Sequence, residues 1–211
     1  QDDGPTAASV TQITQQIGGL TLDESPLSGD GVYTVTLGLS SYFIPATAGA
    51  GTDLAATGSP TYNLVLTDTG AAGVGSGLFA LAAGGGKGAE ILLTSSGGVI
   101  TGSVGGVDYF TITVNASGQV TFAYSNNVDP ANIWSPTPGS SSFDEGAWLN
   151  TGATGTLTLT QTITDRDGDF VTSAGLDIGN GNVFSIQDDG PTAASVTQIT
   201  QQIGGLTLDE S

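Results

Sequence analysis

Residues 109–124 read YFTITVNASGQVTFAY and contain two strand patterns separated by a turn. In YFTITV and in VTFAY apolar and polar residues alternate, as they do in a β-strand with one buried and one exposed face. The residues between them, from Asn115 to Gly118, are of the types that form tight turns. The stretch therefore predicts an antiparallel hairpin that packs one face against a hydrophobic core.

The same alternation recurs along the chain, and no segment has the pattern of a convincing amphipathic helix. Many short strands separated by turn signals are typical of a sandwich or a barrel. We therefore predict an all-β fold, an antiparallel immunoglobulin-like β-sandwich. Its clear strands are expected at residues 32–39, 62–67, 109–114, 120–124 and 156–164, and weaker ones at residues 7–17, 89–94, 99–104, 170–178 and 183–186.

The chain also contains a long repeat without a single change. Residues 1–25 recur letter for letter as residues 187–211, so the period is 186 residues. Solenoid repeats have periods of roughly 20–50 residues, and the longer period indicates whole domains in tandem. We expect residues 1–186 to form one repeat, and residues 187–211 to be the linker and first strand of the next identical one.

The internal organisation of one repeat stays open between two arrangements. A repeat of this length exceeds a single immunoglobulin-like domain of about 100 residues. Residues 126–155 also differ in composition, because they contain three prolines and both tryptophans. One arrangement is a single sandwich. The other is an outer sandwich built from about residues 1–69 and 149–186, with a second β unit inserted at about residues 70–148.

Charge excludes several classes of partner. The chain has 20 acidic residues and only two basic ones, Lys87 and Arg166, for a net charge of −18. Nucleic acids and anionic membrane surfaces bind basic proteins, so neither is an expected partner. No run of about 18 apolar residues is present, and we expect no direct membrane insertion. Bound divalent cations would relieve the self-repulsion of such a chain.

The acidic residues are clustered, and the cluster at residues 165–169 is the sharpest. It reads DRDGD, so that Asp165, Asp167 and Asp169 alternate around Gly168. Calcium takes six to eight oxygen ligands, which such a turn can supply. The segment is not an EF-hand, because its glycine is at the fourth position and its twelfth position is Leu176. The pattern predicts a calcium site between two strands.

Topology suggests that this loop meets other acidic segments. If residues 170–178 form a hairpin with residues 183–186, then the loop lies at the end of the sandwich where the last strand finishes. The first strand would end there too. Crowded carboxylates need a counter-ion, so we predict a calcium site at the linker between repeats. Its ligands are Asp23, Glu24, Asp165, Asp167, Asp169, Asp188 and Asp189, with Asp2, Asp3, Asp209 and Glu210 as the equivalents in the two copies of the repeated segment.

Three motifs carry a resemblance to a known family: LDES at 22–25, TDRDGD at 164–169 and QDDGP at 187–191. Together with residues 97–122, they make the chain similar to the extender repeats of giant RTX adhesins, which Gram-negative bacteria secrete by type I systems. The resemblance implies β-sandwich domains joined by calcium-rigidified linkers. It also implies an extracellular, cell-surface location and a role in surface attachment and biofilm formation. Cadherins offer a looser parallel in the order of their calcium motifs.

The expected function is therefore mechanical. The chain is expected to be a structural extender, monomeric within a tandem array, that contacts neighbouring identical repeats and projects a distal ligand-binding region. The alternative is a carbohydrate- or surface-binding module, in which Trp134, Trp148 and Tyr124 stack on sugars. Catalysis is not expected, because the chain has no His and no Cys. The remaining catalytic candidate is the carboxylate pair Asp144-Glu145, as in a glycosidase.

Overall fold

The computed structural model describes residues 4–24, 33–45, 59–67, 72–125, 133–134 and 145–188. These residues form β-strands and one short 3-10 helix, Ser40–Tyr42, which confirms the all-β prediction. In these ranges no helix is long and apolar enough to cross a membrane. The strands are β1 (Ser9–Val10), β2 (Thr21–Asp23), β3 (Thr34–Gly38), β4 (Phe43–Ile44), β5 (Thr61–Leu66), β6 (Val74–Leu81), β7 (Lys87–Ser96), β8 (Val99–Val104), β9 (Val107–Val114), β10 (Gln119–Tyr124), β11 (Glu145–Asn150), β12 (Leu157–Thr164), β13 (Phe170–Thr172), β14 (Leu176–Asp177) and β15 (Asn180–Asp188).

The largest sheet contains the hairpin that the sequence predicted. Its six strands follow the order β3-β10-β9-β8-β7-β6, and every pairing is antiparallel. Between β9 and β10 the Asn115 side-chain oxygen accepts hydrogen bonds from the backbone N–H groups of Ser117 and Gln119, at 2.9 and 3.1 Å. Gly118 has φ +75°, a conformation that favours glycine. Local turn chemistry therefore closes the hairpin.

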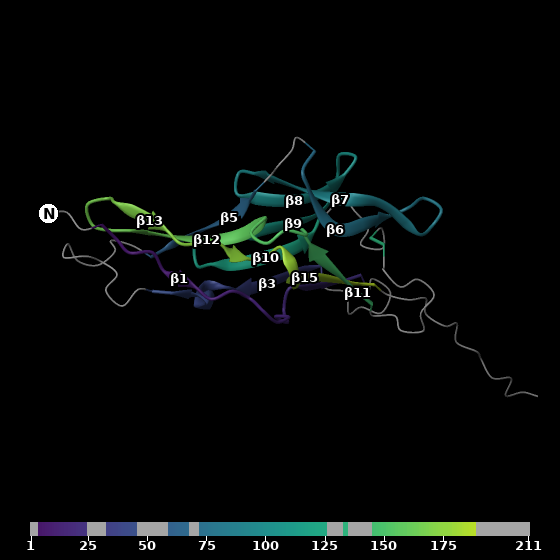
Figure 1. Cartoon of the computed structure of the whole chain (residues 1–211). Coiled ribbons are helices and arrows are strands. Elements are labelled where there is room, and N and C mark those ends of the chain that lie inside the picture. The colour runs from purple at the N-terminus through teal and green to yellow at the C-terminus, as the bar shows by residue number, and fades with distance from the viewer. Residues whose placement is uncertain are drawn as a thin grey trace, which may run out of the picture.

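Besides a two-stranded sheet of β1 and β4, two smaller sheets pack against the six-stranded one. In one sheet β12 pairs with β5, β13 and β14, and in the other β15 lies between β11 and β2. The pairing of β15 with β2 is parallel and sets Ser185 beside Thr21. The strands near the start and the end of the described chain are therefore neighbours. Figure 1 shows an elongated body with β1 and β13 toward one end and β11 toward the other.

One hydrophobic core joins the sheets. The rings of Phe110 and Phe122, from the large sheet, lie edge to face with centroids 5.3 Å apart, and Phe122 meets Phe184 of β15 at 5.2 Å. Gly102 makes room for this stack, because a β-carbon there would lie 2.4 Å from the Phe110 ring. Strands within the suggested insertion at about residues 70–148 thus share a core with the outer strands. They also share a sheet, since β3 pairs with β10.

The expected hairpin between residues 170–178 and 183–186 is absent from the structure. β13 and β14 both pair with β12, and the chain then continues in the same direction as β15, which pairs with β11 and β2. Asp177 holds the bend between them, because its Oδ1 accepts the backbone N–H of Gly179 and its Oδ2 accepts that of Gly155. The turn signals at 179–182 therefore mark a change of sheet and not a reversal of direction.

Candidate functional site

The acidic loop at residues 165–169 connects β12 to β13 and is tightly hydrogen-bonded. The backbone N–H of Asp165 donates to the carbonyl of Asp169 at 2.9 Å. The Asp165 Oδ1 accepts the backbone N–H groups of Gly168 and Asp169, at 3.1 and 2.8 Å. Gly168 has φ +104°, which permits this curl of the chain. Alternating carboxylates therefore sit in a turn whose shape is fixed by its own backbone.

This loop could hold a metal ion. Carboxylate oxygens of Asp165, Asp167 and Asp169 all lie within 4.8 Å of one another; Asp165 is buried and the other two are exposed. The pKa of Asp165 is raised, first by a side-chain hydrogen bond with Asp167, then by burial and by the charge of Asp167, against hydrogen bonds from the Asp169 and Gly168 backbone. A hard cation with oxygen ligands would relieve the same repulsion, so the donor set fits such an ion.

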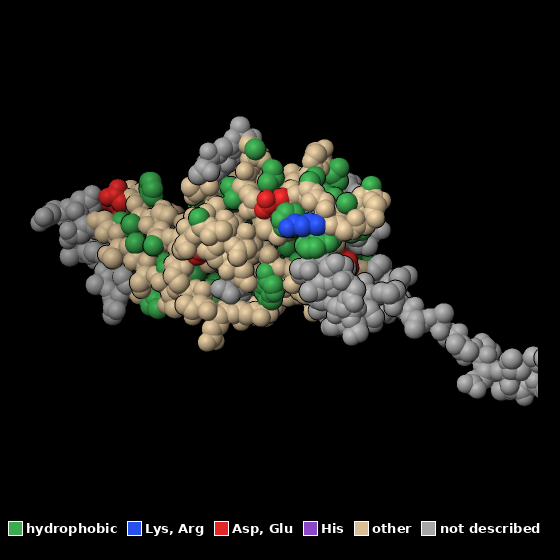
Figure 2. All heavy atoms as spheres, turned by 45° about the vertical axis from the view of Figure 1, so that its right-hand side comes forward, with side chains coloured by type: hydrophobic (Ala, Val, Ile, Leu, Met, Phe, Trp, Pro, Cys, Tyr) green, Lys and Arg blue, Asp and Glu red, His purple; other side chains and the backbone are tan. Residues whose placement is uncertain are grey.

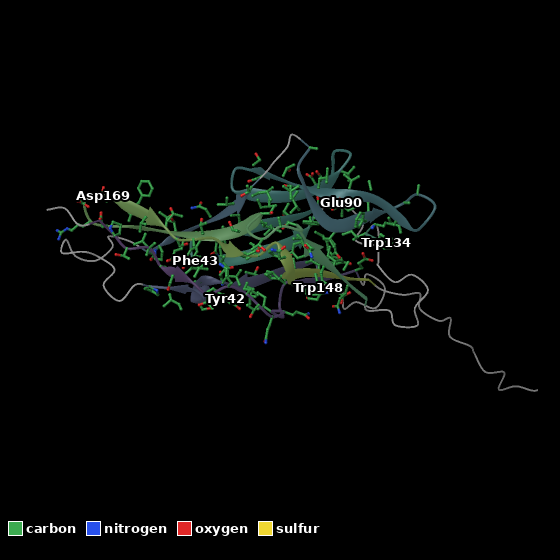
Figure 3. The ribbon with its side chains drawn as sticks, viewed as in Figure 1. Tyr42, Phe43, Glu90, Trp134, Trp148 and Asp169 are labelled. Atoms are coloured by element: carbon green, nitrogen blue, oxygen red, sulfur yellow. The ribbon has the colours of Figure 1, made fainter. Side chains whose placement is uncertain are left out.

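The loop lies at the end of the body where the described chain begins. Figure 3 labels Asp169 at this end, far from the two tryptophans, and Figure 2 shows acidic side chains at the extremity of the described surface. A β-carbon on Gly4 would lie 3.9 Å from the Asp169 Oδ2. Residues at the start of the repeat are thus immediate neighbours of the acidic loop.

Asp23 and Glu24 lie at the opposite end. Asp23 is in register with Gln187, and the Glu24 N–H donates to the Gln187 carbonyl at 3.2 Å. One residue later β15 ends at Asp188, which pairs with Glu145. The predicted meeting of these groups with the 165–169 loop inside one repeat is therefore wrong. The reason is that β13, β14 and β15 run in one direction and carry the chain from one end of the body to the other.

Several predicted ligands cannot be placed. Asp188 is described only through its backbone. Five other predicted ligands lie outside the described residues: Asp2, Asp3, Asp189, Asp209 and Glu210. The side chains of the suggested catalytic pair are likewise outside the described part of the chain. Asp144 is outside the described ranges, and Glu145 is described only as the first residue of β11.

A second feature, an aromatic groove of about 280 Å³, lies near the end of β15; its lining residues are Gly77, Leu78, Phe79, Trp134, Gly146, Ala147 and Trp148. Phe79 and Trp134 meet edge to face with centroids 6.2 Å apart. The Lys87 ammonium lies 3.5 Å from the Phe79 ring centroid. Composition indicated the two tryptophans, but sequence reasoning missed Phe79. Tyr124 is buried and pairs with Tyr33, so it adds no sugar platform beside them.

Comparison with known proteins gives a family for this architecture. No curated protein and no solved structure matches the chain. One family model, described as a domain of unknown function (DUF5801), matches residues 19–179. This range extends from just before β2 to the bend after β14, and so contains the six-stranded sheet and the acidic loop. Since the match covers more than half of the residues, the chain belongs to the DUF5801 family.

Proposed function

We propose that this chain is a spacer unit of an extracellular tandem array, in which calcium stiffens the joint between successive units. The observation that carries the proposal is the position of Gly4 next to the acidic loop, read together with the repeat. Residues 187–191 are identical to residues 1–5, so Gly190 is the counterpart of Gly4 in the next unit. The following unit would therefore bring its own 165–169 loop beside Gly190.

The joint would then combine acidic groups from two units. β15 ends at Asp188, two residues before Gly190, and two residues span at most about 7 Å. Asp23 lies beside the end of the same strand. The three carboxylates of the following loop would thus approach Asp23, Glu24 and Asp188 of the preceding unit. The calcium site is accordingly composed of two units, which differs from the single-unit cluster that the sequence suggested.

Electrostatics supports a cation at this joint. The net charge of −18 makes the approach of two acidic ends unfavourable without a counter-ion. Three carboxylates also leave a calcium ion short of its six to eight oxygens, which the preceding unit would complete. Extracellular calcium modules bind with dissociation constants of about 10⁻⁴–10⁻³ M, which suits a site that fills outside the cell.

The wider setting follows from the resemblance to RTX extender repeats. We place the unit in a cell-surface adhesin of a Gram-negative bacterium, where identical neighbours in the same chain are its partners. Many equal units add length and hold a distal ligand-binding region away from the cell, in support of attachment and biofilm formation. The proposal assigns no catalytic role to the chain.

Small-angle X-ray scattering tests the proposal on the chain extended to two complete repeats. Calcium should raise the maximum dimension and narrow the distribution of shapes, and a chelator should reverse both. Replacing Asp165, Asp167 and Asp169 by Asn in the second repeat only should abolish the response, because that loop is at the joint. The same change in the first repeat is the matched control, since its loop is at the free end. Equal dimensions with and without calcium in the unmodified protein contradict the proposal.

A further inference from the structure

Phe170 is the most exposed large hydrophobic residue of the described chain. Its side chain is 71% exposed, whereas the other exposed large apolar side chains range from 40% to 51%. It begins β13 and directly follows Asp169, so it stands at the end of the body that carries the acidic loop. A single exposed apolar side chain is ordinary on a protein surface. The exposure of Phe170 is informative only because of the surface that would face this side chain in a tandem array.

The opposite end of the body carries the aromatic groove. In β11, Gly146 pairs with Gln187, Ala147 with Ile186 and Trp148 with Ser185. These lining residues therefore lie beside the C-terminal end of β15. Three aromatic side chains line the groove, those of Phe79, Trp134 and Trp148. At about 280 Å³ the groove is smaller than the usual small-molecule pocket of about 300–1,000 Å³. The groove has room for one aromatic side chain.

The repeat brings these two features to the same joint. Gly190 corresponds to Gly4, whose position is beside Asp169, and Phe170 is the next residue. Gly190 follows the end of β15 by two residues, a span of at most about 7 Å. The following repeat therefore presents its Phe170 close to the groove-lining end of β11.

We propose that Phe170 of each repeat docks in the aromatic groove of the preceding repeat, against Phe79, Trp134 and Trp148. This inference rests on the tandem arrangement of the proposed function and gives the joint a second, apolar contact. Aromatic rings prefer such edge-to-face or offset contacts, and burial of Phe170 is favourable on apolar area alone. The contact would set the direction between repeats once calcium has balanced the charge of the two acidic ends.

The test uses the chain extended to two repeats, with Trp134 and Trp148 of the second repeat replaced by Phe. Tryptophan emission then reports only on the groove at the joint. In calcium, Phe170→Ala in the second repeat should remove the protection of these tryptophans from acrylamide quenching. Phe170→Ala in the first repeat, whose Phe170 has no preceding groove, should leave quenching unchanged. Phe170→Leu in the second repeat should keep part of the protection.

The outcomes separate this inference from the calcium proposal. Identical quenching in all these proteins overturns the docking of Phe170, whatever calcium does to the molecular dimensions. Protection lost in the second-repeat variant without any calcium response overturns the calcium joint and supports the docking. Emission of the 211-residue chain is also measured with a panel of neutral saccharides. A shift there, combined with no effect of Phe170→Ala, identifies the groove as a sugar site and overturns the inference.

Discussion

In the chain extended to two repeats, replacing Asp165 of the second repeat by Asn separates the two roles of this side chain. Asn keeps an Oδ1 acceptor for the backbone N–H groups of Gly168 and Asp169, so the turn should retain its shape. The substitution removes one of the three clustered carboxylates and its repulsion with Asp167. In a chelator the variant should therefore be as stable as the parent chain or slightly more stable. In calcium it should lose the stabilisation that the ion provides.

The size of that stabilisation follows from linkage. Calcium at 10 mM exceeds a dissociation constant of about 10⁻⁴–10⁻³ M by about 10- to 100-fold, and binding to the folded state alone then adds about 1.4–2.7 kcal/mol. A domain of this length gains about 2–4 °C in Tm per kcal/mol. In the chain extended to two repeats, the second repeat should thus melt about 3–11 °C higher in calcium than in a chelator.

Thermal unfolding followed by circular dichroism, with and without 10 mM calcium (about 10 times the upper dissociation constant expected for such modules), is the assay. Asp108→Asn in the second repeat is the matched control, because Asp108 is an exposed aspartate on β9 away from the loop and its substitution removes the same charge. The control should keep the full calcium response, and Asp165→Asn should show little or none. A full calcium response in Asp165→Asn would refute the assignment of the ion to this loop.

Two further predictions concern pH and packing. The raised pKa of Asp165 means that the folded chain holds this proton more tightly than the unfolded chain, whose value is near 3.8. In a chelator this group therefore lowers the free energy of unfolding as pH rises from 3.8 through the raised pKa. The affinity for calcium should fall as pH falls through the same interval, because the proton then competes with the ion. An affinity that does not change with pH there would contradict the role of Asp165 as a ligand. Gly102→Ala should cost about 1–3 kcal/mol in urea unfolding, because the new β-carbon would lie 2.4 Å from the Phe110 ring. Gly84→Ala, where nothing lies within 4 Å, is the control, and equal loss in both variants argues against the packing explanation.

Much of the fold was predictable because its signals are local. Alternating residues at 109–114 and 120–124, with a turn between them, predicted β9 and β10 and their pairing. The composition of the 165–169 segment predicted the grouping of its three carboxylates, since neighbours in one turn cannot lie far apart. The edge-to-face contact of Phe79 with Trp134 was not predictable, because the two residues come from distant segments and no pattern links them.

The placement of the acidic segments shows where such reasoning ends. Glycine and asparagine at 179–182 signal a bend, and the same residues serve a reversal or a change of sheet. Which of the two occurs depends on the strands that are available as hydrogen-bond partners, and here β12 receives β14 while β11 and β2 receive β15.

By itself, the sequence determined the strand content, the 186-residue repeat and which residues make up the acidic loop. Tertiary structure alone decided that this loop and Asp23 lie at opposite ends of the body. It also placed the exposed Phe170 at one end and the aromatic groove at the other. The physical reason is that side-chain periodicity records which face of a strand is buried. It carries no information about the direction in which the next strand runs, because that depends on hydrogen bonds to strands far away in the chain.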